Sequence, residues 1–146
     1  MALTQVLDED YPSTLESVDE AEAKILHAAA EAGFDEDDQH RIGMAVRECM
    51  VNAVVHGNRY NRRKTVHVGV TVEMLPPGAK LTIQIADQGE GFEMHEVPDP
   101  LHDTNLLRHS GRGLFLMGAF MDEMKVEKRH PQGTTVTLVK TIGETK

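Results

Sequence analysis

The strongest constraint on the fold is a pair of segments in which apolar residues occupy every second position. Residues 66–72 alternate four valines with His, Gly and Thr, and residues 81–85 alternate Leu and Ile with polar residues. A period of two is typical of a β-strand with one buried face. The Pro76-Pro77-Gly78 segment between them predicts a turn. Other segments of the chain must therefore cover the apolar face of this sheet.

Two segments with helical spacing predict that cover. Apolar residues recur at helical intervals over residues 15–29, and Gly33 predicts the end of that helix. Asp35 with Asp38 three residues later resembles a capped helix start. An apolar stripe then continues to His56-Gly57, so we predict a second helix over this stretch.

The rest of the chain completes an α+β fold. A polar loop follows at residues 58–64, and the long polar segment from Gln88 to Ser110 is a candidate lid because loops of that length are uncommon unless functional or disordered. Further elements are predicted: strands at 3–7, 124–128 and 134–142, and a short helix at 111–121. This order predicts one domain over residues 1–146, a two-layer sandwich with helices on one face of a mixed, largely antiparallel sheet.

Composition excludes several functions. Fifteen Lys and Arg against 24 Asp and Glu leave a net charge of -9, which disfavours binding to DNA and to anionic membrane surfaces. No apolar stretch approaches the roughly 20 residues that span a bilayer, and no signal-peptide pattern appears. The lone cysteine, Cys49, cannot form an internal disulfide. We therefore expect a cytoplasmic protein with neither nucleic acid nor membrane as a direct partner.

Polar residues recur every four positions on the second helix. Glu48, Asn52 and His56 share one face of it. Asn52 is a neutral oxygen donor that could complete a Mg²⁺ shell beside phosphates, and Glu48 could accept a hydroxyl proton. The simpler interpretation of such a row is a solvated helix face.

A carboxylate follows the second alternating strand. Asp87 has the parity of the apolar residues before it, so it should point toward the core. Gly89 and Gly91 allow close backbone approach or positive φ. A buried carboxylate needs a hydrogen-bond donor, and the exocyclic amino group of adenine is a suitable one. The alternative is an ordinary turn.

Two later segments could also face a ligand. Gly111-Arg112-Gly113 precedes the predicted short helix, whose first backbone N–H groups suit phosphate oxygens. Thr134 shares parity with the apolar residues of the last strand, which places its hydroxyl in the same layer as Asp87 if both strands share one sheet. The alternatives are a flexible hinge and an ordinary strand threonine.

Together these residues resemble the GHKL ATPase superfamily, whose elements are an E-x-x-x-N helix, a D-x-G-x-G loop, a G-x-G lid segment and a G-T strand. The extended form from Glu48 to Gly57 and the segment from Arg108 to Gly113 look most like the bacterial anti-sigma-factor serine/threonine kinases. The resemblance covers nearly the whole chain. It implies the Bergerat fold, ATP and Mg²⁺ as cofactors, and transfer of the γ-phosphoryl group to a serine of an anti-anti-sigma protein.

The resemblance also implies a role for each matching position. Glu48 would be the catalytic base, Asn52 the Mg²⁺ ligand, Asp87 the adenine contact and Thr134 a water-mediated adenine contact. Gly89 and Gly91 would make room for the nucleotide. Gly111, Arg112 and Gly113 would wrap the phosphates as part of the lid. Arg108 would be the cation that stabilises charge on the transferred group. Positioning and charge stabilisation are what phosphoryl transfer requires.

Other interpretations stay open at this stage. The chain could be a non-catalytic regulatory protein that uses ATP only to gate a partner, and Glu48 is the residue that separates the two hypotheses.

A histidine kinase catalytic module would need an attached helical domain. P-loop and eukaryotic kinase motifs are missing, and the spacing of His95, His102 and His109 sets no metal geometry. We also expect a homodimer that holds one sigma factor.

Overall fold

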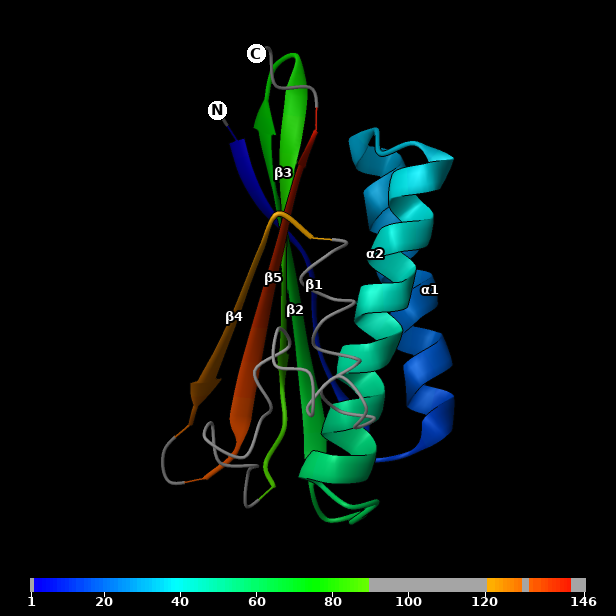
Figure 1. The fold of residues 1–146 in the computed structure, drawn as a ribbon, viewed down its shortest axis with the longest axis vertical. Helices are drawn as coiled ribbons and strands as arrows, with labels where there is room; N and C mark the ends of the chain where they lie inside the picture. Colours follow the sequence, from blue (N-terminus) through cyan, green and yellow to red (C-terminus); the bar gives the residue numbers. More distant parts are fainter. Residues whose placement is uncertain (1, 90–120, 130–131, 143–146) are drawn as a thin grey trace, which may run out of the picture.

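The computed structural model describes residues 2–89, 121–129 and 132–142. Two helices lie side by side against one face of a five-stranded sheet, and the opposite face of the sheet carries no helix in the described part of the chain (Figure 1). The predicted α+β two-layer sandwich is confirmed. No helix in these ranges is long and apolar enough to cross a membrane.

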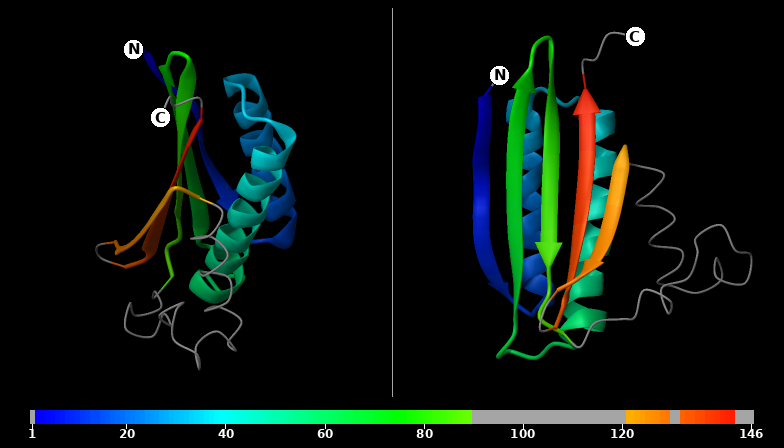
Figure 2. Two further views of the ribbon diagram at one scale, coloured as in Figure 1. Left: turned by 45° about the horizontal axis from the view of Figure 1, so that its top comes forward. Right: turned by 90° about the vertical axis from the view of Figure 1, so that its left-hand side faces the viewer.

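The sheet has the order β1-β2-β3-β5-β4 (Figure 2). The strands are β1 Ala2–Pro12, β2 Thr65–Leu75, β3 Gly78–Ala86, β4 Glu123–Lys128 and β5 Thr134–Ile142. Every pairing between neighbours is antiparallel. The predicted largely antiparallel sheet is therefore confirmed, but the described strands contain no parallel pair that would make it mixed. The physical reason is that β5 inserts between β3 and β4, which run in the same direction but do not pair.

The two alternating segments form the central hairpin. Val70 pairs with Ile83 and Val72 with Leu81, and Pro76-Pro77 closes the turn. Alternate side chains of both strands are buried against the helices. This layer meets an apolar stripe from each helix, and together they form one core. The largest fully buried side chains of that core include Ile25, Ile42, Met50, Leu81, Ile83, Ile85 and Leu138.

The first helix ends, and the second begins, where the sequence predicts. Helix α1 spans Leu15–Ala32, and Gly33 ends it with a φ of 104°. Helix α2 spans Glu36–Val51, and the Asp35 carboxylate accepts a hydrogen bond from the backbone N–H of Asp38 at 2.8 Å. These side-chain and glycine caps satisfy backbone groups that a helix leaves unpaired at its ends.

The sequence predicted a regular second helix as far as Gly57, but the regular helix ends earlier. After Val51 the chain forms one π-helical turn, η1, over Asn52–Gly57. The backbone N–H of Asn58 donates to Ala53 O at 2.8 Å, which is a bond across five residues rather than four. Such wide turns occur mostly as single insertions, frequently at functional sites. Here the turn begins at Asn52, the predicted metal ligand.

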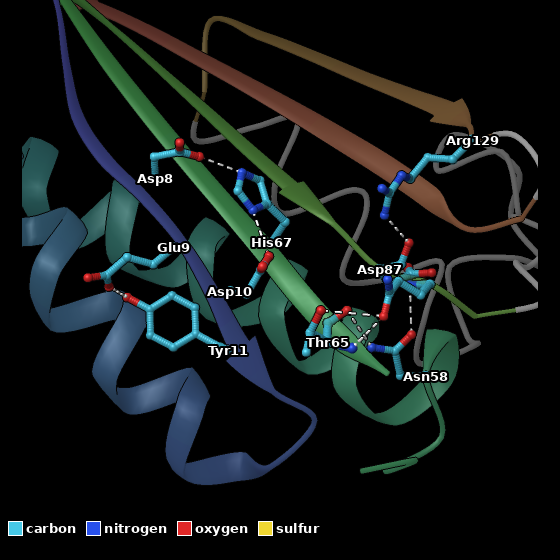
Figure 3. A network of polar contacts seen from close by, with 10 residues as sticks. Asp8, Glu9, Asp10, Tyr11, Asn58, Thr65, His67, Asp87 and Arg129 are labelled. Carbon is cyan, nitrogen blue, oxygen red and sulfur yellow. Dashed lines mark hydrogen bonds and ion pairs between the residues drawn. The ribbon is translucent and has the colours of Figure 1, made fainter. Parts of the chain in front are cut away.

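Strand β1 is longer than the predicted segment 3–7. Its second half, with Asp8, Glu9 and Asp10, has no period-two pattern and is ordered by pairing with β2. On the solvent side, His67 of β2 contacts Asp8 and Asp10 through Nε2 and Nδ1, at 2.6 Å and 2.7 Å (Figure 3). The predicted helix at 111–121 lies outside the described residues except for Met121.

Candidate functional site

The end of helix α2 brings Glu48 and Asn52 to the sheet side of the molecule. Glu48 is half-buried, Asn52 is 6% exposed, and His56 is exposed. The three residues of the predicted polar row therefore differ in burial, and the π-helical turn at Asn52–Gly57 changes the spacing between Asn52 and His56. His56 points to solvent, and the two inner residues face the interior.

Within the described residues, the buried polar atoms without a hydrogen-bond partner include Oδ1 of Asn52 and Oγ1 of Thr134. Leaving such an atom unsatisfied costs about 1–3 kcal/mol, so a native protein that retains two of them needs an explanation, and a ligand is a common one. An amide oxygen and a hydroxyl suit, respectively, a hydrated Mg²⁺ ion and a polar or water-bridged group of a nucleotide.

Asp87 lies at the carboxyl end of β3 and is only 3% exposed, so the predicted inward orientation is confirmed. Its Oδ1 accepts a hydrogen bond from the backbone N–H of Gly89 at 3.0 Å, and its carboxylate also accepts from the backbone N–H of Thr134. Burial raises the pKa of Asp87, although these two bonds and the charge of Arg129 act in the opposite direction. The carboxylate is therefore poorly solvated and is favoured by a further donor.

Asp87 and Thr134 are joined by their backbones as well. The N–H of Asp87 donates to Thr134 O at 2.9 Å, so the two residues lie next to each other at the ends of neighbouring strands. The prediction that the Thr134 hydroxyl faces the layer of Asp87 agrees with its burial. A buried carboxylate and a buried hydroxyl that has no hydrogen-bond partner among the described residues thus lie at one end of the sheet.

Glycines allow the end of helix α2 to touch this strand end. A Cβ on Gly57 would lie 2.5 Å from Oδ2 of Asp87, and a Cβ on Gly89 would overlap the backbone of Gly57. Gly133 has a φ of 117°, and a Cβ there would overlap the carbonyl of Asp87. Larger residues would separate the helix from the Asp87 loop or displace the carboxylate.

We expect Gly57→Ala to weaken nucleotide binding about tenfold, because the added methyl group must displace the Asp87 carboxylate, and about 1.4 kcal/mol corresponds to a factor of ten. The measurement is a calorimetric titration with ATP·Mg²⁺. Gly69→Ala is the matched control, since a Cβ at Gly69 meets nothing within 4 Å. Equal affinities of the two variants would contradict the prediction.

Several predicted site residues fall outside the described ranges. They are Gly91, Arg108, Gly111, Arg112 and Gly113, together with nearly all of the candidate lid at 88–110 and the three histidines weighed as metal ligands. Their roles stay predictions. Among the described residues no group of three His, Cys, Asp or Glu side chains could hold a metal ion. Asn52, the predicted Mg²⁺ ligand, lies within the described ranges.

Residues that the sequence did not indicate hold the Asp87 loop in place. Nη1 of Arg129 donates to Asp87 O at 2.7 Å (Figure 3). Nε2 of Gln132 donates to Gln88 O at 2.8 Å, and the side chain of Asn58 accepts from the backbone N–H of Gln88, also at 2.8 Å. Each lies in a polar loop with no local pattern. Of these residues, Asn58 could have been suspected from the sequence, because it directly follows His56-Gly57 at the end of the predicted motif.

The geometry, with helices on one face of an antiparallel sheet and a buried aspartate between helix end and strand end, defines a nucleotide-binding class of domain. The sequence pattern described as "Histidine kinase-like ATPase domain" matches residues 11–140. The chain therefore belongs to the histidine kinase-like ATPase family, and the resemblance stated from the sequence is confirmed.

Similar proteins narrow the family to one branch. An anti-sigma F factor from Thermoanaerobacter sp. (strain X514) is 31% identical, with both chains covered completely. The serine-protein kinase RsbW from Bacillus licheniformis is 34% identical over 77% of this chain and 70% of that protein.

Solved structures agree on the fold. The structure of the RsbU and RsbW domains of Rv1364c from Mycobacterium tuberculosis superposes with a TM-score of 0.62 at 20% identity. It covers 96% of this chain, which spans about a third (32%) of that one. The SiaB-SiaC complex from Pseudomonas aeruginosa also gives a TM-score of 0.62, at 11% identity, with 94% of this chain and 91% of that chain covered.

Proposed function

We propose that this protein is an ATP-dependent serine/threonine protein kinase that acts as an anti-sigma factor. The observation that carries the proposal is the occurrence of a buried carboxylate, Asp87, with buried oxygens on Asn52 and Thr134 that have no hydrogen-bond partner among the described residues. This combination occurs in a chain of the histidine kinase-like ATPase family, among relatives named anti-sigma F factor and serine-protein kinase RsbW.

In this proposal the site residues divide the recognition of ATP. Asp87 accepts a hydrogen bond from the adenine amino group, and the Thr134 hydroxyl binds the base through a water molecule. Asn52 supplies an oxygen to Mg²⁺, which when bound neutralises charge on the phosphates. Gly89 and Gly91 leave room for the nucleotide. Arg108 and the segment Gly111-Arg112-Gly113 complete the phosphate side.

The chemistry then requires only one proton acceptor. The hydroxyl oxygen of a serine forms a bond to the γ-phosphorus, the bond from that phosphorus to the β–γ bridging oxygen breaks, and ADP leaves. The hydroxyl proton passes to Glu48, which is half-buried at the inner end of helix α2. A positioned carboxylate is a common proton acceptor for a reacting hydroxyl group.

The proposed partners are proteins. By analogy with the relatives' names, the phosphorylated protein would be an anti-anti-sigma factor and the sequestered protein a sigma factor. The net charge of -9 disfavours direct contact with nucleic acid, and a cytoplasmic location belongs to the same proposal. The test is transfer of label from γ-labelled ATP to a small protein in the presence of Mg²⁺.

We also propose that the protein forms a homodimer through the edge strand β1. Val6, 43% exposed, lies on this strand and helps to line a groove of about 580 Å³ between β1 and α1. The outer edge of β1 pairs with no other strand in the described part of the chain, and a partly apolar open edge is a ready surface for pairing.

Light scattering is expected to give about twice the 16.2 kDa of one chain. Val6→Lys should shift the mass toward one chain, because it places a charge in the contact. Met44→Lys, a change of an equally exposed apolar residue (41%) on helix α2, should leave the mass unchanged. A wild-type mass of one chain at micromolar concentration would contradict the dimer.

A further inference from the structure

The residue that follows the buried aspartate is held from three sides. The backbone N–H of Gln88 donates to Oδ1 of Asn58 at 2.8 Å, and its side-chain Oε1 accepts from the N–H of Thr65 at 2.7 Å. Its carbonyl accepts from Nε2 of Gln132 at 2.8 Å. Because Gln88 lies between Asp87 and Gly89, these bonds restrict the loop that presents the Asp87 carboxylate.

Asn58 is the buried member of this network, with 2% of its surface exposed. Its Nδ2 donates to Oγ of Ser13 at 2.9 Å and to the carbonyl of Thr65 at 3.0 Å. Ser13 in turn donates its hydroxyl proton to Lys64 O at 2.6 Å. Asn58 therefore connects the β1–α1 turn, the start of β2 and the loop after β3, three segments that are distant in sequence.

The partners determine the orientation of the Asn58 amide. The Thr65 carbonyl can only accept, and the Gln88 N–H can only donate. The nitrogen must therefore face Thr65 and the oxygen must face Gln88, since the reverse orientation would oppose like groups on both sides. Only a primary amide satisfies these contacts with one side chain, and a buried amide with all these bonds made is a rigid support.

We propose that Asn58 is a positioning residue for adenine recognition, which it serves by holding the Asp87–Gly89 loop through Gln88. The inference rests on the proposed function, because it assumes that Asp87 binds the adenine amino group. Asn58 itself reaches only Gln88 in this loop and acts through the backbone. A carboxylate held in a fixed position discriminates better between a base with an amino group and a base without one. A mobile carboxylate can move away or find other donors when the amino group is missing.

The test compares ATP with purine riboside triphosphate, which lacks only the amino group. Dissociation constants of both Mg²⁺ complexes are measured by calorimetry for wild type and Asn58→Ala. A hydrogen bond to a charged acceptor predicts a wild-type preference for ATP of about tenfold to a hundredfold. In Asn58→Ala we expect this ratio to fall to roughly one-tenth of the wild-type value, because Asp87 is no longer held.

The control is Ser17→Ala, which removes a different buried polar group, a hydroxyl with a 2.7 Å bond to the Pro12 carbonyl but no link to Gln88. It should keep the wild-type ratio. If Asn58→Ala weakens both nucleotides equally and keeps the ratio, its role is general stability and the proposal is wrong. A merely structural residue has no reason to affect the two nucleotides differently.

A measurement on wild type decides the matter if Asn58→Ala does not fold. Hydrogen exchange by NMR should show the Gln88 N–H protected in the nucleotide-free protein, and exchange at the rate of an open loop would overturn the proposal. Asp87→Asn separates the proposed adenine contact of Asp87 from the proposed positioning role of Asn58. If that variant keeps the ratio, the adenine contact itself is wrong, whereas loss in Asp87→Asn but not in Asn58→Ala rejects Asn58 alone.

Discussion

Glu48→Ala is expected to lower the rate of phosphoryl transfer by a factor of about 10²–10⁴, the usual contribution of a positioned general base. ATP affinity should change little, because the proposed role of Glu48 is toward the serine hydroxyl and not toward the nucleotide. Glu48→Gln, which keeps the size of the side chain but cannot take up a proton, should lose as much activity. The measurement is the single-turnover transfer of label from γ-labelled ATP to the partner protein.

Two comparisons make this prediction specific. Glu36→Ala, in the first turn of the same helix and exposed, should retain normal transfer. Nucleotide titrations on all variants separate a loss of chemistry from a loss of binding. If no labelled protein depends on Glu48 while ATP still binds, the protein is a nucleotide-gated regulator without phosphoryl transfer of its own.

Asp87→Asn is expected to weaken ATP binding by about tenfold to a hundredfold, through loss of a charged acceptor for the adenine amino group. The new amide also presents N–H donors toward the N–H groups of Gly89 or Thr134, which bind the carboxylate in the wild type. Calorimetric titration with ATP·Mg²⁺ gives the affinity. Asp122→Asn is the control, because Asp122 also accepts a backbone N–H bond, from Thr141, but is exposed. An unchanged affinity for Asp87→Asn would exclude an adenine contact.

The pH dependence of binding has a definite sign. Burial raises the pKa of Asp87 above its ordinary value in the free protein, and a bound donor favours the ionised form. ATP affinity of wild type should therefore fall as the pH is lowered through this raised pKa. The nucleotide titrates as well, but equally for both proteins, so the difference between wild type and Asp87→Asn isolates the carboxylate.

The raised pKa of Asp87 affects the stability of the nucleotide-free protein with the opposite pH dependence to that of ATP affinity. The folded protein binds the Asp87 proton more tightly than the unfolded chain does, so this group contributes stability at low pH. That contribution is lost as the pH rises through the interval between the ordinary and the raised pKa. At neutral pH the ionised carboxylate is thus an energetic cost to the free protein, which is consistent with a residue retained for binding rather than for folding.

Much of the fold follows from local patterns in the chain. The period-two segments predicted β2 and β3, and the parity of Asp87 predicted its burial. Gly33 predicted the end of α1, and Asp35 with Asp38 predicted the start of α2. These features were predictable because strand parity and helix capping depend on residues only a few positions apart.

The sequence by itself determined the elements, the two-layer class and the inward aspartate, whereas the tertiary structure alone decided how distant segments meet. It placed β5 between β3 and β4, produced the π-helical turn at Asn52, and brought Asn58 and Arg129 to the loop of Asp87, across 30 and 42 positions of sequence. Such contacts have no local signature, because polar side chains in loops take their partners from whatever the packed core brings beside them.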